Sequence, residues 1–345
     1  MGNLHPEFAA GIYGSSCANY TKRSDQAMPL TADPKLLTLS HDVIEGFDKV
    51  DGGVHPGFRP AHAKGILLTG TFSPSSEAAS LTRAPHIQRD STPVTARISN
   101  FAGIPTVPDN DPQGASPRGF AIRFNLAEHS HTDIVAHSVD AFPARTADEF
   151  LGFLNALIAT DPAGPHPNAI EQFLGAHPAA LRFVQAPKPI PTSFAKESFF
   201  AVSAFKFTNA QGVSRYGRYR ILPVAGNEYL DDAGAASQSA DFLFDELKER
   251  VAKGPVKFRI VVQLGEDGDV TDDATVRWPE DRSQLTLGEI SLNEIVPNNA
   301  AEQQHIIFDP IPRIDGIEAS GDPLFDARAN IYLMTGRRRR AAGTK

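Results

Sequence analysis

From residue 54 onward the chain is divided into short runs of residues with high β propensity, and turn-forming residues separate these runs. Four of the runs lie at residues 66–72, 94–99, 119–124 and 256–264. Glycine, proline, asparagine and aspartate, which favour turns, stand between them. Runs of this length with this spacing are typical of an antiparallel sheet or barrel. The pattern therefore predicts such a sheet or barrel as the core of the fold.

The clearest single element is a β-hairpin. Residues 204–208 and 214–221 both alternate between apolar and polar side chains, and a four-residue loop at 209–212 that ends in Gly212 separates them. Loops of this length containing glycine commonly join two antiparallel strands. We expect one face of this hairpin to lie on the core.

Helices are fewer, and the sequence marks their ends. Thr146 and Glu149 form the pattern of a capping box, in which both side chains accept hydrogen bonds from free amides at the start of a helix. A second amphipathic helix is expected over 241–251, and Gly254 follows it. Shorter helices are expected at 42–47 and 169–174.

The chain contains no internal repeat and no segment typical of a domain linker. Its runs of strands and separate helices favour the α+β class. We expect an N-terminal arm over residues 1–50, followed by one domain over residues 51–345.

The charge balance limits the possible partners. The chain has 33 lysines and arginines and 41 aspartates and glutamates, which gives a net charge of −8. Nothing at the level of the whole chain therefore attracts it to nucleic acid, and no nucleic-acid partner is expected. The basic run at residues 337–340 is predicted to be a solvated tail.

A single cysteine, Cys17, excludes a disulfide framework, a thiolate zinc site and an iron–sulfur cluster. Metal chemistry would therefore use histidine, carboxylate or tyrosine side chains. Residues 1–7 lack the basic and apolar regions of a secretory signal, and no apolar run is long enough to span a membrane. We expect a cytoplasmic protein without a membrane span.

Two small clusters carry residue types suited to chemistry. His62 follows Arg59 directly before a β-like run, and Arg328 precedes Tyr332 by four residues. On a helix this spacing places the guanidinium against the phenol, and a nearby cation favours the phenolate form that can ligate ferric haem iron. Taken alone, each cluster is more typical of ordinary surface or core packing.

In series, these clusters resemble the haem catalase superfamily, and more closely its short catalase-related peroxidases. The segments that carry the resemblance are RPAHAKG at 59–65, VTARIS at 94–99, SPRGFAIRF at 116–124 and RANIY at 328–332. Further similar stretches lie at 133–138, 204–210, 278–282, 308–310 and 315–318. The resemblance covers residues 54–332. It implies a catalase-like antiparallel β-barrel core with surrounding helices and a buried haem, heme b with ferric iron.

The resemblance also implies roles for four residues on the distal side of the haem. His62 corresponds to the distal histidine, which takes a proton from peroxide and returns it to the departing oxygen. Ser99 corresponds to the serine that orients this histidine. Arg59 and Arg97 correspond to arginines that pair with the haem propionates.

On the other side, Tyr332 corresponds to the iron ligand and Arg328 to the arginine that keeps this ligand ionised. Phe142 and Phe150 fall where the family packs aromatic rings around the distal pocket. His137 stands where large catalases have a distal asparagine that helps to position the second peroxide. The departure at His137 favours a peroxidase over a catalase.

The implied function is a haem-dependent peroxidase that reduces hydrogen peroxide or organic hydroperoxides through an oxoferryl haem, with a small molecule as electron donor. Three alternatives stay open: an enzyme of fatty-acid hydroperoxides similar to allene oxide synthase, a catalase of low activity, and a haem-binding protein without turnover. Enzymes similar to allene oxide synthase favour threonine directly before the distal histidine, where this chain has Ala61. Because the long arms of large catalases are absent, we expect a monomer or a small homo-oligomer.

Overall fold

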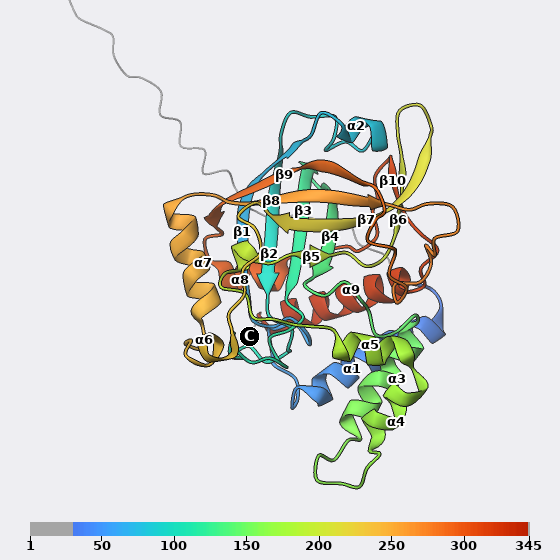
Figure 1. Ribbon diagram of the computed structural model, residues 1–345, viewed down its shortest axis with the longest axis vertical. Helices are drawn as coiled ribbons and strands as arrows, with labels where there is room; N and C mark the ends of the chain where they lie inside the picture. Colours follow the sequence, from blue (N-terminus) through green and yellow to red (C-terminus); the bar gives the residue numbers. More distant parts are fainter. Residues whose placement is uncertain (1–29, 344–345) are drawn as a thin grey trace, which may run out of the picture.

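The computed structural model describes residues 30–343, and its centre is a closed antiparallel β-barrel (Figure 1). Eight strands form the ring, and each pairs with its neighbours in the order β7-β5-β4-β3-β2-β1-β9-β8, after which β8 pairs with β7. Their bounds are β1 Gly65–Pro74, β2 Thr92–Ser99, β3 Gly119–Ala127, β4 Ser130–His137, β5 Phe199–Phe200, β7 Ser214–Pro223, β8 Val256–Leu264 and β9 Gln284–Ile295. Two further strands, β6 (Phe205–Thr208) and β10 (Ile317–Ala319), extend the sheet beyond β7.

Aliphatic and aromatic side chains together fill the core. Along β3, Phe120, Ile122 and Phe124 alternate with residues of the opposite face and are almost completely buried. The Phe120 ring lies 4.9 Å from that of Phe258 on β8. Since side chains alternate with period two along a strand, this spacing directs every second residue into the core. The predicted barrel with surrounding helices is confirmed.

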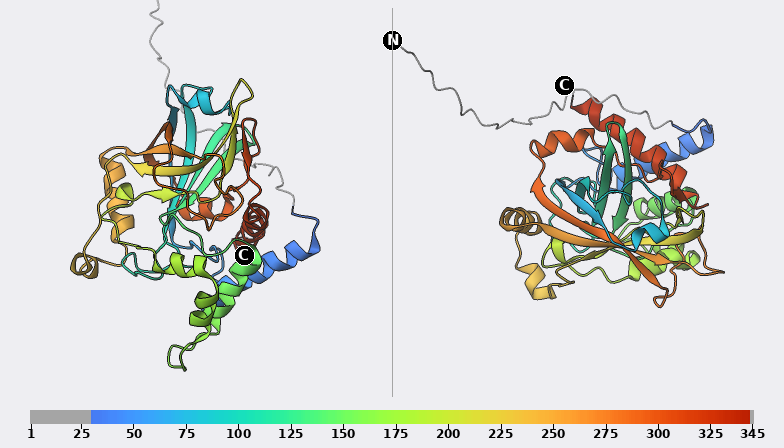
Figure 2. Two further views of the ribbon diagram at one scale, coloured as in Figure 1. Left: turned by 45° about the vertical axis from the view of Figure 1, so that its right-hand side comes forward. Right: turned by 90° about the horizontal axis from the view of Figure 1, so that it is seen from above.

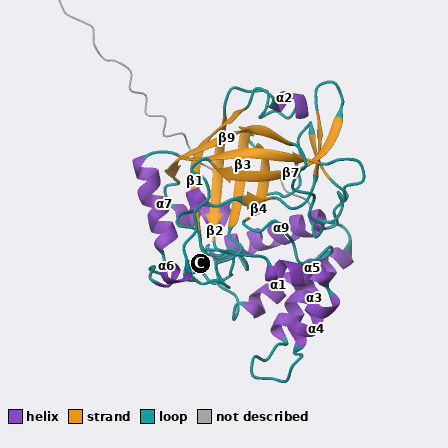
Figure 3. Ribbon diagram, in the orientation of Figure 1, coloured by secondary structure: helices purple, strands orange, loops and turns teal. Residues whose placement is uncertain are grey.

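Helices cover one end of the barrel and one of its sides. Figure 3 shows the strands gathered in the upper half of the molecule and most helices below them. The helices are α1 Pro34–Val50, α2 Ala78–Leu81, α3 Ala147–Ile158, α4 Ala169–Ala176, α5 Pro178–Gln185, α6 Asp232–Ala236, α7 Phe242–Lys253, α8 Asn299–His305 and α9 Leu324–Ala342, with a 3₁₀ turn at Phe194–Lys196. Within residues 30–343, none of them has both the length and the apolar character needed to cross a membrane.

Helix α1 is longer than the short helix expected at 42–47. Asp33 caps its N-terminus by accepting a hydrogen bond from the Lys35 amide at 2.9 Å, and Pro34 occupies the first turn, where its missing N–H costs nothing. The helix packs against α3 and α9, as the views in Figure 2 show. Residues 1–29 of the expected arm, including Cys17, lie outside the described residues, and the division at residue 50 stays a prediction.

The hairpin is confirmed and the capping box only in part. β6 and β7 pair from Phe205 with Gly217 to Thr208 with Ser214. At the start of α3 the Thr146 hydroxyl accepts from the Glu149 amide, as predicted. The Glu149 carboxylate, however, accepts from the amide of Arg145, one residue before the cap, at 2.8 Å. The box is therefore shifted by one residue on its carboxylate side.

Candidate active site

A cavity of about 860 Å³ lies between the barrel and helices α1, α3 and α9. All nine site residues proposed from the sequence line it, although they come from segments far apart in the chain. They are Arg59, His62, Arg97, Ser99, His137, Phe142, Phe150, Arg328 and Tyr332. The sequence gives only the order of these residues along the chain, and the folded barrel end brings their side chains together.

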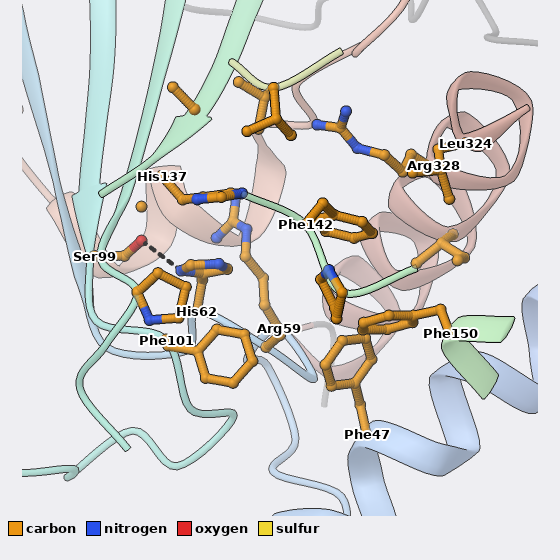
Figure 4. Close-up of a pocket in the computed structure, with 18 of the residues that line it drawn as sticks. Phe47, Arg59, His62, Ser99, Phe101, His137, Phe142, Phe150, Leu324 and Arg328 are labelled. Atoms are coloured by element: carbon orange, nitrogen blue, oxygen red, sulfur yellow. Dashed lines mark hydrogen bonds between the residues drawn. The ribbon is translucent and has the colours of Figure 1, made fainter. Parts of the chain in front are cut away.

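His62 precedes β1 and is held by two partners at the end of β2 (Figure 4). Its Nδ1 lies 3.0 Å from the carbonyl oxygen of Asn100 and 3.2 Å from the Ser99 hydroxyl oxygen. A carbonyl can only accept, so Nδ1 carries the proton and Nε2 keeps its lone pair. Burial, with a contribution from Arg97, lowers the pKa of His62 to about 3. The imidazole is therefore neutral at neutral pH and can act as a base.

Gly119 makes room for this arrangement. It lies opposite Ser99 in the pairing of β2 and β3. A Cβ atom at this position would lie 2.7 Å from the Ser99 hydroxyl oxygen and 2.8 Å from Nδ1 of His62, inside van der Waals contact. The site thus depends on a residue without a side chain here. In the sequence, Gly119 belongs to the SPRGFAIRF motif at 116–124, which by itself assigns it no role.

His137 ends β4 and lines the same wall as His62 (Figure 4). Its Nδ1 accepts a hydrogen bond from the Val139 amide at 3.4 Å, which leaves the proton on Nε2. That Nε2 is buried and has no hydrogen-bond partner among the described residues. Burial, with a contribution from Arg328, lowers the pKa of His137 to about 4. His137 is therefore a neutral donor with an unused N–H.

Arg328 and Tyr332 lie on α9, and the four-residue spacing brings them together as predicted. Nε and Nη2 of Arg328 each lie 3.3 Å from the Tyr332 hydroxyl oxygen, and the guanidinium carbon is 5.6 Å from the centre of the ring. Figure 4 shows Arg328 projecting from its helix on the far side of the pocket from His62. The pair thus places a cation directly against a phenol oxygen.

Three arginines at the cavity have no carboxylate partner within residues 30–343. Arg59 donates to the carbonyls of Gln303 and Ile306, and Arg97 to those of His62 and Ala63. Burial and the charge of Arg97 lower the pKa of Arg59 well below its usual value.

The third is Arg339, which donates to the Ile306 carbonyl and leaves its Nε without a partner in the described chain. Burial lowers the pKa of Arg97 to about 9 and that of Arg339 to about 8. Buried charges of one sign without counter-ions are costly, so this part of the cavity is suited to an anionic ligand.

The basic run at 337–340 is therefore not a solvated tail, and that prediction was wrong. It continues helix α9, where Arg338 forms a bidentate ion pair with Asp48 of α1, at 2.5 and 2.9 Å. Arg339 is 3% exposed. The signal that could have found it is its spacing from Tyr332, seven residues, which is two turns along the same helix face.

Aromatic rings form the wall beside α3. Phe142 and Phe150 stack with their centres 5.6 Å apart and an angle of 21° between their planes. Phe47 of α1 packs on Phe150 at 5.5 Å and also lines the cavity. Phe47 is not among the site residues expected from the sequence, although Val43, Phe47 and Val50 repeat at the spacing of one helix face.

Comparison with known proteins identifies the family of this chain. The family model described as catalase matches residues 21–345. A catalase-related peroxidase of Mycolicibacterium paratuberculosis is 34% identical over 298 residues, which cover 84% of this chain and 90% of that protein. A second one, from Synechococcus elongatus, is 32% identical over 82% of this chain and 84% of its own length.

Among solved structures, a fungal catalase superposes with a TM-score of 0.71 at 22% identity, over 97% of this chain and 66% of that one. Catalase A of Saccharomyces cerevisiae gives the same TM-score and identity, over 92% of this chain and 67% of its own. These structures share the fold. The match of the family model over residues 21–345, together with the two relatives above 30% identity, shows that this chain belongs to the catalase family.

Proposed function

We propose that this protein is a haem-dependent peroxidase, an oxidoreductase that reduces hydrogen peroxide or an organic hydroperoxide with electrons from a small donor. One observation supports the proposal above all: His62, a neutral base, and the Arg328–Tyr332 pair line the same cavity. Two relatives are named catalase-related peroxidase, and their matches to this chain cover 90% and 84% of their own length. Their names support the same activity.

The residues of the cavity fit a haem. Tyr332 would ligate the iron through its phenol oxygen, against which the Arg328 guanidinium lies. Arg59, Arg97 and Arg339, which lack carboxylate partners within residues 30–343, would neutralise the two propionates. The stacked rings of Phe142 and Phe150 would pack on the macrocycle. When bound, haem supplies the electrons that cleave the O–O bond of peroxide.

The chain's own residues then handle the proton. Nε2 of His62 accepts the proton of the bound peroxide and returns it to the departing oxygen, while Ser99 and the Asn100 carbonyl hold Nδ1. The free Nε2–H of His137 donates to a peroxide oxygen. Such a donor can orient peroxide as an amide N–H would, but a bulkier ring occupies the space, which favours the peroxidase role over rapid disproportionation.

The alternatives receive less support from the cavity. Ala61 lines it and carries no hydroxyl, the group expected beside the histidine in the enzymes of fatty-acid hydroperoxides. Haem binding alone does not require a histidine held in one tautomer at a left-handed backbone angle, φ 60°. We propose in addition a cytoplasmic location and a monomer or small homo-oligomer.

The test compares absorption spectra of the haem-supplemented full chain, two site variants and one control variant. We expect the wild type and Tyr216→Phe, a control at a tyrosine that is 39% exposed, to bind one haem with the spectrum of a tyrosinate-ligated ferric centre. Tyr332→Phe should lose that spectrum. His62→Ala should keep haem and lose donor oxidation when peroxide is added. A wild type that binds no stoichiometric haem, or full activity in both site variants, would refute the proposal.

A further inference from the structure

Asp109 lies outside the cavity and is completely buried. One carboxylate oxygen accepts from the Lys64 ammonium and from the Asn100 side-chain amide, each at 2.7 Å. The other accepts from the backbone amides of Leu243 and Phe244, in the first turn of α7, at 2.9 and 3.4 Å. A buried carboxylate with this many donors is firmly fixed in place.

Two of these partners belong to the segments that hold His62. Residues 62–64 and 100–102 pair side by side: the His62 amide donates to the Phe101 carbonyl, the Ala63 amide to the Ala102 carbonyl, and the Asn100 amide to the Lys64 carbonyl. Asp109 joins the Lys64 and Asn100 side chains at the end of this short ladder. Asp109 therefore holds residues 62–64, which contain the histidine, against residues 100–102, which contain its hydrogen-bond partner Asn100.

Asn100 transmits this constraint to the imidazole. Its side chain binds Asp109, while its backbone carbonyl accepts from Nδ1 of His62 at 3.0 Å. His62 itself has a φ of 60°, a left-handed conformation that a side chain other than glycine adopts only where its surroundings enforce it. Both the backbone angle and the ring orientation of His62 thus depend on the two segments keeping their relative position.

We propose that Asp109 is a positioning residue for His62. Its carboxylate holds the Asn100 carbonyl against Nδ1, keeps the proton on that nitrogen and leaves the lone pair of Nε2 facing the cavity. A free neutral imidazole distributes its proton between both nitrogens, so a looser carbonyl would let the tautomer with Nε2–H appear. In that form His62 could not accept a proton from peroxide.

This inference rests on the proposed function only for its effect on turnover, and its main test needs neither haem nor peroxide. The ring nitrogens of His62 are observed by NMR in the ¹⁵N-histidine-labelled full chain, and His62→Gln assigns the signals. The ¹⁵N shifts report which nitrogen carries the proton. Asn100→Ala removes the amide that binds Asp109 and keeps the backbone carbonyl, and Asp109→Asn changes the carboxylate itself.

Asp241→Asn is a matched control. Asp241 forms an ion pair with the same Lys64 ammonium, at 2.6 Å, but its side chain is 65% exposed and has no hydrogen bond to Asn100. We expect the wild type and this control to show the Nδ1–H tautomer alone. Asn100→Ala should show a mixture of tautomers, and Asp109→Asn should do so if it folds.

The kinetic counterpart is a fall in kcat/KM for peroxide of about tenfold in Asn100→Ala, part of the roughly 10²–10⁴ that a general base supplies, with KM for the donor unchanged. An Nε2–H tautomer in the wild type would overturn the proposal. The proposal would also be overturned if folded Asn100→Ala showed the Nδ1–H tautomer alone. The same holds if the control Asp241→Asn showed as large a fraction of the Nε2–H tautomer as Asn100→Ala. If the tautomers behave as expected but the haem-supplemented wild type does not reduce peroxide, the positioning role stands and the proposed function fails.

Discussion

Gly119→Ala tests how closely the site is packed. The added Cβ would lie 2.7 Å from the Ser99 hydroxyl oxygen and 2.8 Å from Nδ1 of His62. The φ of Gly119 is outside the left-handed region, so the methyl group is the only change that matters. The serine hydroxyl can rotate, but the imidazole is held by the Asn100 carbonyl and cannot move without breaking that bond.

Overpacking a well-packed interior typically costs about 1–3 kcal/mol. We therefore expect the free energy of unfolding to fall by about this amount, with a lower melting temperature. Since the clash displaces the ring of His62, whose Nε2 is the proton acceptor, kcat/KM for peroxide should fall about tenfold, within the range for loss of a general base. Thermal unfolding and steady-state kinetics with one dye donor measure the two effects.

Gly175→Ala is the matched control. Gly175 lies in helix α4, and nothing is within 4 Å of its added Cβ. Alanine there should stabilise the helix by about 0.5–1 kcal/mol and leave turnover unchanged. The packing argument is refuted if Gly119→Ala keeps the kcat/KM of the wild type, because the methyl group would then be accommodated without moving His62.

Three further predictions follow from the charges around the cavity. Arg339→Met keeps the aliphatic stem and removes the buried guanidinium, so it should weaken haem retention, which is measured by transfer of haem to an apo-globin. Arg337→Met, at an exposed position, should leave haem retention unchanged. Equal retention in the two variants would show that Arg339 holds no propionate. His137→Asn should raise oxygen release from hydrogen peroxide relative to donor oxidation, and an unchanged ratio measured with an oxygen electrode would contradict the role given to this ring. Burial holds the pKa of His62 at about 3 and that of His137 at about 4, below the value of 6.5 for unfolded histidine, so the unfolded chain binds more protons between these values. Stability should therefore be lost as the pH falls from about 6.5 toward 3, and denaturant titrations of His62→Gln/His137→Asn should show a smaller loss than those of the wild type.

The local patterns of the sequence determined the strands and several helices. Alternation over residues 204–208 and 214–221 predicted β6 and β7, because side chains of a strand alternate between its faces whatever surrounds it. The spacing of Arg328 and Tyr332 predicted their contact for the same kind of reason, since residues four apart meet on any helix. The nine proposed site residues came from the resemblance to the catalase superfamily that the motifs carry, and all of them line the cavity.

The tertiary structure alone decided what lies next to what across the chain. Closure of the barrel requires β7 to pair with β8, and no pattern within either strand specifies that partner. In the sequence, Arg339 is one of four consecutive arginines with nothing to distinguish it. The packing of α9 places its side chain at the cavity, whereas Arg337 is exposed to solvent.

Asp109 and Gly119 likewise have no signal of their own. Their importance is a matter of distances to His62 and its partners, 2.7 Å from Asp109 to the Asn100 amide and 2.8 Å from a Cβ on Gly119 to Nδ1. Periodicity and capping depend on neighbours within a few residues, which the sequence contains directly. Burial, the pairing of charges and the room left for one atom depend on segments far apart in the chain, and only folding brings these together.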